Sequence, residues 1–380
     1  MFYDSKGQSD LFANPDIPSD QDWHEINIES PSLNGRHKVA PFVAIDFETY
    51  YDKDYSLEKM GYWEYCSHEC FNAYAVSLVK WTGKKWLCWT GHPDKAPWKE
   101  IENMVWVSHN TAFDSTVFLF LQIEVLPAAW HCTMELAKFL QICSGSLDKV
   151  VQCIWGEKLD KSVRERMAGG SDGLSDKEIR EYVALDSIWC AKIWARFQYW
   201  FPDEERRVAL QTRKLNRRGI HIDKKTCIKN LEHIEKRFNE IHQSLPWYLS
   251  KPPTSKDAFK KFCSMQGVQP PASMSKKDEG FILWQNHLKD RLLNADEETH
   301  IKIEKALKGL KILEKLSQMK VQIERLLSSC REDNTIPINL IYCRAIHTRR
   351  WQTGGGTRLQ NLNRETFEGV NLRKLYIPRE

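Results

Sequence analysis

The stretch PFVAIDFET, residues 41–49, decides how the rest of the chain is interpreted. Its nearly unbroken apolar run predicts a strand buried in the middle of a sheet. Side chains two positions apart on a strand point to the same face, so Asp46 and Glu48 are expected to project together from a hydrophobic element. An exposed edge strand with two solvated acids is the alternative, because the pattern Asp-x-Glu also begins at residues 176, 203 and 296.

Two later segments each add an acidic residue in an apolar context. SHNTAFD ends at Asp114, where a helix of otherwise apolar residues begins, so Asp114 is either a functional carboxylate or a first-turn acid favoured by the helix dipole. In YVALD, Tyr182 and Asp186 are four residues apart and share one helix face. Trp189 and Ile193 continue that face, which predicts that an aspartate lies on the buried side of the helix.

Four carboxylates gathered in one place need compensation, because burying each of them costs several kcal/mol unless it is paired. No lysine or arginine adjoins any of them in the sequence. Hard oxygen ligands favour Mg²⁺ or Mn²⁺ over zinc. The sequence therefore predicts two divalent cations about 4 Å apart, which would clamp the attacking and leaving oxygens of a phosphodiester. The expected ligands are Asp46, Glu48, Asp114 and Asp186, and Glu48 and the Tyr182 hydroxyl would orient the attacking water.

Alternating short apolar and amphipathic runs predict that residues 37–201 form an α/β unit. Strands are expected at FVAIDF, AYAVSLV, KWLCWT and MVWVSH. Helices are expected at 112–121, 133–142 and 147–155, and from a capping box at Ser175 and Glu178 to about Gln198.

After Pro202 the composition becomes helical and charged, and residues 202–335 are expected to form a mainly helical region. Helices are predicted at 203–217, 223–243, 255–265 and 299–329. The last of these has apolar residues every three or four positions, at Ile303, Leu307, Leu310, Leu313, Leu316, Met319, Ile323 and Leu326. A third block, residues 336–380, is strand-like and rich in arginine.

Charge is distributed unevenly along the chain. Residues 1–36 carry seven acids and are expected to form a flexible, solvated tail, whereas residues 341–380 carry seven arginines and are expected to form a phosphate-contacting surface.

Eleven cysteines without regular spacing indicate reduced thiols, and no secretory or membrane-spanning segment is evident. We therefore expect a cytoplasmic protein with no membrane partner. The fifteen tryptophans serve either core packing or base stacking, and their apolar neighbours favour the core.

The order of these motifs resembles that of the DEDDy 3'-5' exonucleases, which have an RNase H-like fold, and in particular the proofreading domain of phage-type family A DNA polymerases. The resemblance implies that the three aspartates and Glu48 hold two metal ions and that Tyr182 positions the water. It further implies that the DNA 3' end contacts Thr49, Asn110 and Phe113.

The likeness continues beyond the exonuclease block. EERRVALQTRKLNRRGIHID resembles the entry into the polymerase part, and the long helix ending near Ser329 resembles its thumb. IHTRRWQTGGGTRLQNLNR resembles the stretch that grips the primer-template, which makes Arg350, Gln360 and Asn361 candidate DNA contacts. A basic glycine-rich turn is the alternative, and Arg349 stands where the family usually has glycine. The implied fold is an RNase H-like domain, a thumb-like region and the incomplete start of a palm at 336–380.

Three functional hypotheses follow. The first is a proofreading 3'-5' exodeoxyribonuclease acting on single-stranded or mispaired DNA ends, as the N-terminal part of a family A polymerase and in the host cytoplasm if phage-encoded. The second is a split polymerase, in which a second polypeptide supplies the palm and fingers. The third is a primer-template binding module with an inert acidic site. In all three, this chain alone is not expected to synthesise DNA, because the polymerase metal ligands are missing.

Overall fold

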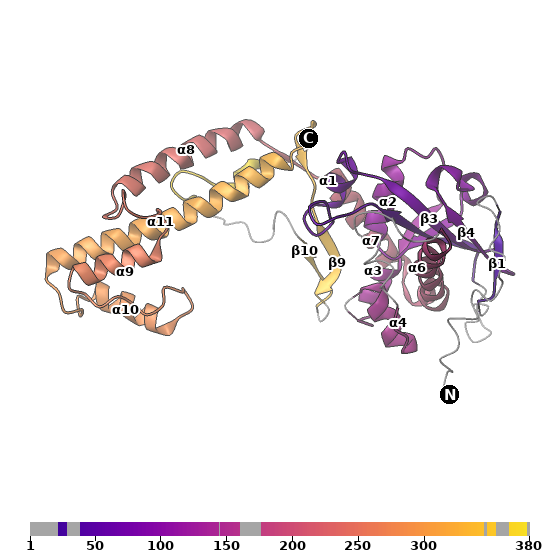
Figure 1. The fold of residues 1–380 in the computed structure, drawn as a ribbon, viewed down its shortest axis with the longest axis horizontal. Coiled ribbons are helices and arrows are strands. Elements are labelled where there is room, and N and C mark those ends of the chain that lie inside the picture. The colour runs from indigo at the N-terminus through magenta and orange to yellow at the C-terminus, as the bar shows by residue number, and fades with distance from the viewer. Residues whose placement is uncertain are drawn as a thin grey trace. The chain divides into compact units, whose positions relative to one another are not determined.

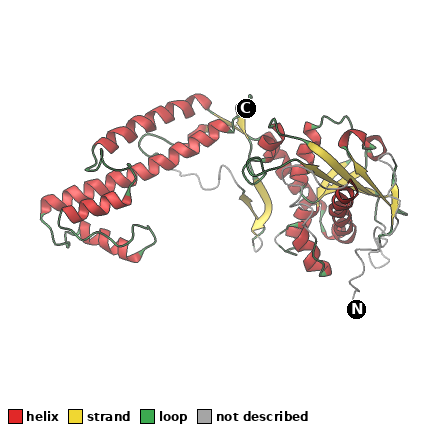
Figure 2. Ribbon diagram, viewed as in Figure 1, coloured by secondary structure: helices red, strands yellow, loops and turns green. Residues whose placement is uncertain are grey.

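The computed structural model describes residues 22–28, 39–143, 145–159, 176–345, 348–354 and 365–377, and only the backbone of residues 176–182. The chain divides into two compact units (Figure 1). Unit 1 comprises Met1–Gly219 and Pro337–Gln360, and unit 2 comprises Ile220–Ile336 and Asn361–Glu380. Strands gather mainly in unit 1, whereas long helices dominate unit 2 (Figure 2).

Unit 1 is built on a six-stranded mixed sheet in the order β1-β4-β3-β2-β5-β6. The pairs β1–β4, β4–β3 and β3–β2 are antiparallel, and the pairs β2–β5 and β5–β6 are parallel. The strands are β1 (His24–Ile26), β2 (Phe42–Thr49), β3 (Ala73–Trp81), β4 (Trp86–Gly91), β5 (Val105–Ser108) and β6 (Ala129–Cys132). The predicted central position of β2 is confirmed, since it lies between β3 and β5.

Each face of this sheet is covered by its own helices. Phe42 and Ala44 of β2 pack with the helices α3 (Thr133–Phe139), α4 (Leu147–Trp155) and α6 (Asp176–Phe197). Val43 and Ile45 face the opposite core, with α1 (Tyr62–Ser67) and α2 (Thr111–Phe120). Because side chains alternate along a strand, Asp46 and Glu48 belong to the face that α6 covers.

Unit 1 also contains segments that the sequence pattern assigns elsewhere. The helix α7 (Asp203–Arg218) and the hairpin of β9 (Leu340–Ala345) and β10 (Arg350–Thr353) belong to it. Arg213 of α7 pairs with Glu135 of α3 and donates to the Trp130 carbonyl at 2.7 Å, with both charged side chains buried. Asn216 bonds both the N–H and the carbonyl of Leu340. These buried polar contacts hold α7 in unit 1, so the first segment of this unit ends at residue 219 and not at the expected residue 201. The block 336–380 is divided between the two units.

The segment 1–36, expected to be a flexible tail, contains an edge strand of the sheet. His24, Glu25 and Ile26 pair with Cys88, Leu87 and Trp86 of β4. Backbone pairing needs no special side chains, so the acidic composition concealed this strand. Residues 1–21 and 29–38 lie outside the described residues.

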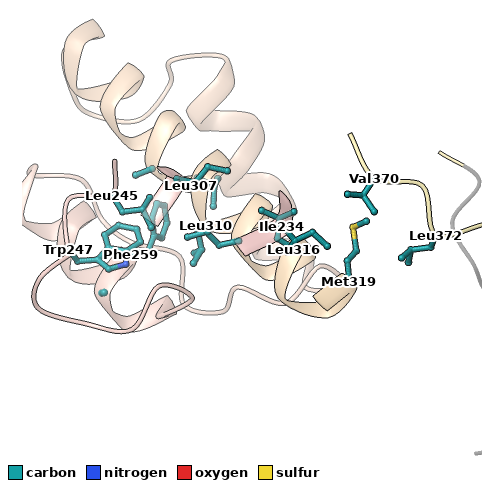
Figure 3. Close-up of a cluster of buried hydrophobic side chains, with 14 of the residues drawn as sticks. Ile234, Leu245, Trp247, Phe259, Leu307, Leu310, Leu316, Met319, Val370 and Leu372 are labelled. Atoms are coloured by element: carbon teal, nitrogen blue, oxygen red, sulfur yellow. The ribbon is translucent and has the colours of Figure 1, made fainter. Parts of the chain in front are cut away.

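Unit 2 is a helical bundle with a small sheet. Its helices are α8 (Lys224–Gln243), α9 (Lys256–Met265), α10 (Glu279–Lys289) and α11 (Glu297–Ser328), and its sheet has the order β11-β7-β8 (Tyr376–Ile377, Ile220–Ile222, Thr335–Ile336). Each helix begins at an Asp or Ser whose side chain accepts from the backbone N–H three residues on. The predicted apolar positions of the long helix are all buried, and Figure 3 shows several of them in the core of this unit.

Candidate functional site

Three of the predicted carboxylates lie together in unit 1. Asp46 and Glu48 extend from β2 and Asp186 from α6, and one oxygen of each lies within 4.8 Å of the others. The residue after Asp186 connects α6 to the sheet, because the Ser187 hydroxyl donates to the Ser77 carbonyl at 3.2 Å. Ser77 is the residue of β3 that pairs with Asp46. This buried bond therefore holds Asp186 beside the strand that carries the other two acids.

Asp114 reaches the same cleft from the opposite layer. It lies in the first turn of α2 and is 2% exposed. The Phe47 N–H of β2 donates to Asp114 Oδ1 at 3.4 Å. Phe47 lies beyond Ala44, which is the last residue of β2 that pairs with β5. Burial raises the pKa of Asp114 to about 7, although bonds from Ser108 and from backbone N–H groups oppose this shift. Among the described residues, the group of acids whose oxygens lie within 4.8 Å of one another consists of Asp46, Glu48 and Asp186 and does not include Asp114.

A cleft of about 670 Å³ contains all four of these acids. One wall is the loop at residues 51–59, and other lining residues come from β2, α2 and the start of α4. The three side chains predicted to contact a DNA end, Thr49, Asn110 and Phe113, line the same cleft. Tyr182 precedes Asp186 by one turn of α6, and its side chain lies outside the described residues.

The helix α1 provides two residues that the sequence analysis missed. The Tyr65 hydroxyl is 2.8 Å from Thr49 Oγ1, and the Tyr62 hydroxyl donates to Asn110 Oδ1 at 3.2 Å. Both rings also lie near Phe113, at centroid distances of 6.1 Å for Tyr62 and 6.0 Å for Tyr65. The available signal was weak: two tyrosines three residues apart in GYWEYC share a helix face, but this helix is short.

The candidate DNA contact Arg350 lines a different cavity from the one that holds the carboxylates. This second cavity, of about 420 Å³, is formed by Arg350 of β10 with Glu205, Val208, Tyr342, Cys343, Arg349 and Trp351. Arg349 has a φ of 51°, in the left-handed region where glycine is easily accommodated. This conformation explains why a glycine would suit the position that Arg349 occupies. Gln360 and Asn361 lie outside the described residues.

His109, next to Asn110, has a structural environment. One ring nitrogen is 2.9 Å from Thr133 Oγ1 and the other is 2.8 Å from the Gly145 carbonyl. The carbonyl can only accept, so Nε2 carries the proton and Nδ1 accepts from the Thr133 hydroxyl. Burial lowers the pKa of His109 to about 4. The neutral ring thus holds the loop at Gly145, which forms part of the cleft wall.

We expect the stability of unit 1 to fall on acidification because of His109. Its folded-state pKa of about 4 lies below the unfolded value of 6.5, so the unfolded chain binds the proton first. The contribution is fully present above pH 6.5 and is lost progressively down to about pH 4, at about 1.4 kcal/mol per pH unit. Urea unfolding at several pH values should show a shallower slope in His109→Gln. The exposed His92→Gln serves as the control, and an identical slope in both variants would contradict this account.

The donor set of the cleft fits a divalent cation. Its ligand atoms are carboxylate oxygens, which hard cations such as Mg²⁺ and Mn²⁺ prefer to the softer zinc. The group of Asp46, Glu48 and Asp186 could hold a metal ion, and Asp114 adds a fourth carboxylate to the same cleft. Like charges at these separations repel, so a cation would remove an electrostatic penalty from the fold.

In the described part of the chain, no helix is long and apolar enough to cross a membrane.

No protein-family model and no curated protein matches the chain. Among solved structures, it is similar to the POL domain of Pol1 from M. smegmatis in complex with DNA primer-template and dNTP. The two are 15% identical, with a TM-score of 0.52 and coverage of 88% of this chain and 54% of that chain. The chain therefore spans about half the length of that structure. At this identity the likeness shows the fold, which is related to that of a DNA polymerase.

Proposed function

We propose that unit 1 is a metal-dependent 3'-5' exodeoxyribonuclease that removes nucleotides from single-stranded or mispaired DNA 3' ends. The observation that carries the proposal is the convergence of Asp46, Glu48 and Asp186 from two elements, with Asp114 in the same cleft. Carboxylates gathered this closely repel one another, and bound cations relieve that repulsion. It is suited to two-metal hydrolysis of a phosphodiester.

Each residue has a proposed role. Asp46, Glu48, Asp114 and Asp186 hold two Mg²⁺ or Mn²⁺ ions, which, when bound, clamp the attacking and leaving oxygens and activate a water. Tyr182 orients that water. The pKa of about 7 for Asp114 describes the buried side chain without a cation, and a bound cation would favour its ionised form.

The proposed substrate is a DNA 3' end. Thr49, Asn110 and Phe113 line the cleft beside the carboxylates, in position to contact a terminal nucleotide. The neighbouring polymerase structure contains a DNA primer-template, which supports DNA as the partner. A paired end must unpair before it enters the cleft, and unpairing costs less at a mismatch, which supplies proofreading selectivity.

We also propose that unit 1 is RNase H-like and that the chain is related to phage-type family A polymerases. The mixed sheet with helices on both faces and the similarity to a polymerase fold support this relation. In this proposal, Arg350, Gln360 and Asn361 contact the primer-template. The exposed position of Arg350 on β10 supports the proposed contact between Arg350 and the primer-template.

The proposal is tested by the direction and metal dependence of degradation. Purified protein with Mg²⁺ should shorten a 5'-labelled single strand stepwise, and the same strand labelled at its 3' end should release labelled mononucleotides at once. EDTA should stop both reactions, and a terminal mismatch should be removed faster than a paired end. Internal cuts, shortening from the 5' end, or equal rates in EDTA would each contradict it.

A further inference from the structure

Unit 2 has a cavity of its own, of about 330 Å³, lined by α10, α11, the loop before α10 and Phe367. Leu288, Leu307 and Ile312 give it an apolar floor, and the two leucines are almost completely buried. The charged side chains that line it are one glutamate, Glu304, and five lysines: Lys276, Lys289, Lys308, Lys311 and Lys315. The cavity therefore combines apolar surface with an excess of positive charge.

The positive charge of this cavity has no carboxylate partner. Among the described residues, none of the five lysines forms an ion pair. Other lysines of the same long helix are paired: Lys302 lies 2.6 Å from Glu298, and Lys320 lies 2.7 Å from Glu235. The middle of α11 therefore presents cations to the cavity that nothing in the described part of unit 2 neutralises.

Lys311 shows the effect of this crowding. Its ammonium group donates to the Gln285 Oε1 atom of α10, a neutral acceptor. Burial lowers the pKa of Lys311, and the charges of Lys289 and Lys276 lower it further. An anion placed among these three lysines would relieve their mutual repulsion.

The lysines of α11 lie on one side of the cavity. Lys308, Lys311 and Lys315 are three and four residues apart, so they share one face of the helix and extend over roughly 10 Å of its axis. At one end of this row, the Lys315 ammonium lies 3.7 Å from the centre of the Phe367 ring. Because lysine side chains are long and flexible, their charged ends can reach a partner that rests on the apolar floor.

We propose that this cavity is a docking site for an acidic peptide segment of another protein, in which acidic residues flank one bulky apolar side chain. The apolar side chain enters the cavity and covers Leu288, Leu307 and Ile312, and the flanking carboxylates pair with the lysines. Charge complementarity selects the acidic segment, and the apolar floor selects the side chain in its centre. This site is separate in its residues from the carboxylates of unit 1.

The apolar floor favours a peptide over a nucleic-acid backbone. Phosphates would meet the lysines, but a sugar-phosphate backbone has no apolar side chain to cover the floor. A peptide with an aromatic or aliphatic side chain satisfies both parts of the cavity, and burial of that side chain adds to the affinity.

The test measures binding of fluorescein-labelled peptides to the full chain by fluorescence anisotropy. The probe has three glutamates on either side of one phenylalanine, and the matched control has serine in place of the phenylalanine. The phenylalanine peptide should bind at least about tenfold more tightly, because the charges are equal and only it buries an aromatic ring. Its affinity should fall as salt is added, because the carboxylates and lysines are exposed. Equal affinities for the two peptides would overturn the inference.

Charge-reversal variants assign the binding to this cavity. Lys308→Glu with Lys311→Glu should weaken the phenylalanine peptide by about tenfold or more, since two attractions become repulsions. Lys229→Glu with Lys236→Glu makes the same change of charge at exposed positions of α8 and should weaken it by less than about twofold. Equal losses in the two double variants would place the peptide elsewhere and overturn the inference.

A third variant changes the floor without changing the charge. Ile312→Asn should lower the affinity for the phenylalanine peptide to that of the serine peptide, and should leave the serine peptide unaffected. Thermal melting checks that the variant is folded, and Ile312→Ala gives the same comparison with a smaller loss if it is not. A folded variant that keeps the full preference for phenylalanine would contradict the role of the floor.

An oligothymidylate separates this partner from nucleic acid. A strand of seven nucleotides has six phosphates, which match the six glutamates of the peptide, and it should bind more weakly than the phenylalanine peptide. If it bound more tightly and lost its affinity in Lys308→Glu with Lys311→Glu, the cavity would be a nucleic-acid surface and the inference would be overturned.

Discussion

Alanine at both Asp46 and Glu48 is expected to abolish metal-dependent shortening of single-stranded DNA, with a loss of at least roughly a thousandfold in rate. These residues supply two of the three carboxylates that approach within 4.8 Å, and both project from the same face of β2. Their removal leaves Asp186 and Asp114 as the only acids of the proposed set in the cleft, too few to hold two cations. The measurement is the single-turnover rate on a 5'-labelled strand.

The same double variant should not be less stable than the wild type without metal. Two like charges within 4.8 Å of each other repel by at least roughly 3 kcal/mol at an effective dielectric constant of about 20, and relief of this repulsion offsets the side-chain packing that alanine removes. Wild-type protein should melt at a higher temperature when Mg²⁺ is added, because the cation binds the folded state only, and the variant should not respond. A matched control, Glu102→Ala with Glu124→Ala, removes two exposed acids from the same unit. Full activity in the cleft variant would refute the assignment.

Replacing Arg213 by methionine should destabilise unit 1 by about 3–5 kcal/mol. Arg213 is 8% exposed and Glu135 is 7% exposed, and their ion pair joins α7 to α3. Without the guanidinium, the carboxylate stays buried with too little compensation, and the Trp130 carbonyl loses its donor as well. Urea unfolding followed by tryptophan fluorescence should show the midpoint fall sharply.

Two further variants show whether the cost is that of an unpaired buried charge. Adding Glu135→Leu to Arg213→Met should restore most of the missing stability, since an apolar pair of similar volume replaces the ions. Arg207→Met breaks the exposed pair with Glu204 and should change stability by less than about 1 kcal/mol. If Arg213→Met cost no more than Arg207→Met, the buried pair would not be what holds α7 in this unit.

Periodicity was a sound guide where one physical rule dominated. The strand at 42–49 was predictable because a strand buried on both faces needs an almost continuous apolar run. The long helix at 297–328 was predictable because burial of one helix face imposes an apolar period of about 3.6 residues. The helix α10 was missed because four of its apolar residues form the continuous run FILW, which shows no helical period. The strand β1 was missed because backbone pairing at a sheet edge leaves almost no side-chain signal.

The sequence by itself determined that Asp46 and Glu48 share one face of a buried strand and that Asp186 lies on the buried side of a helix, because both statements depend only on local geometry. Tertiary structure decided that these segments meet, since a buried bond between Ser187 and Ser77 connects residues 110 positions apart. It also decided that Asp114 is desolvated and that Tyr65 and Tyr62 of α1 are hydrogen-bonded to Thr49 and Asn110. Burial and hydrogen-bond direction depend on every neighbour in space, and no local pattern records them.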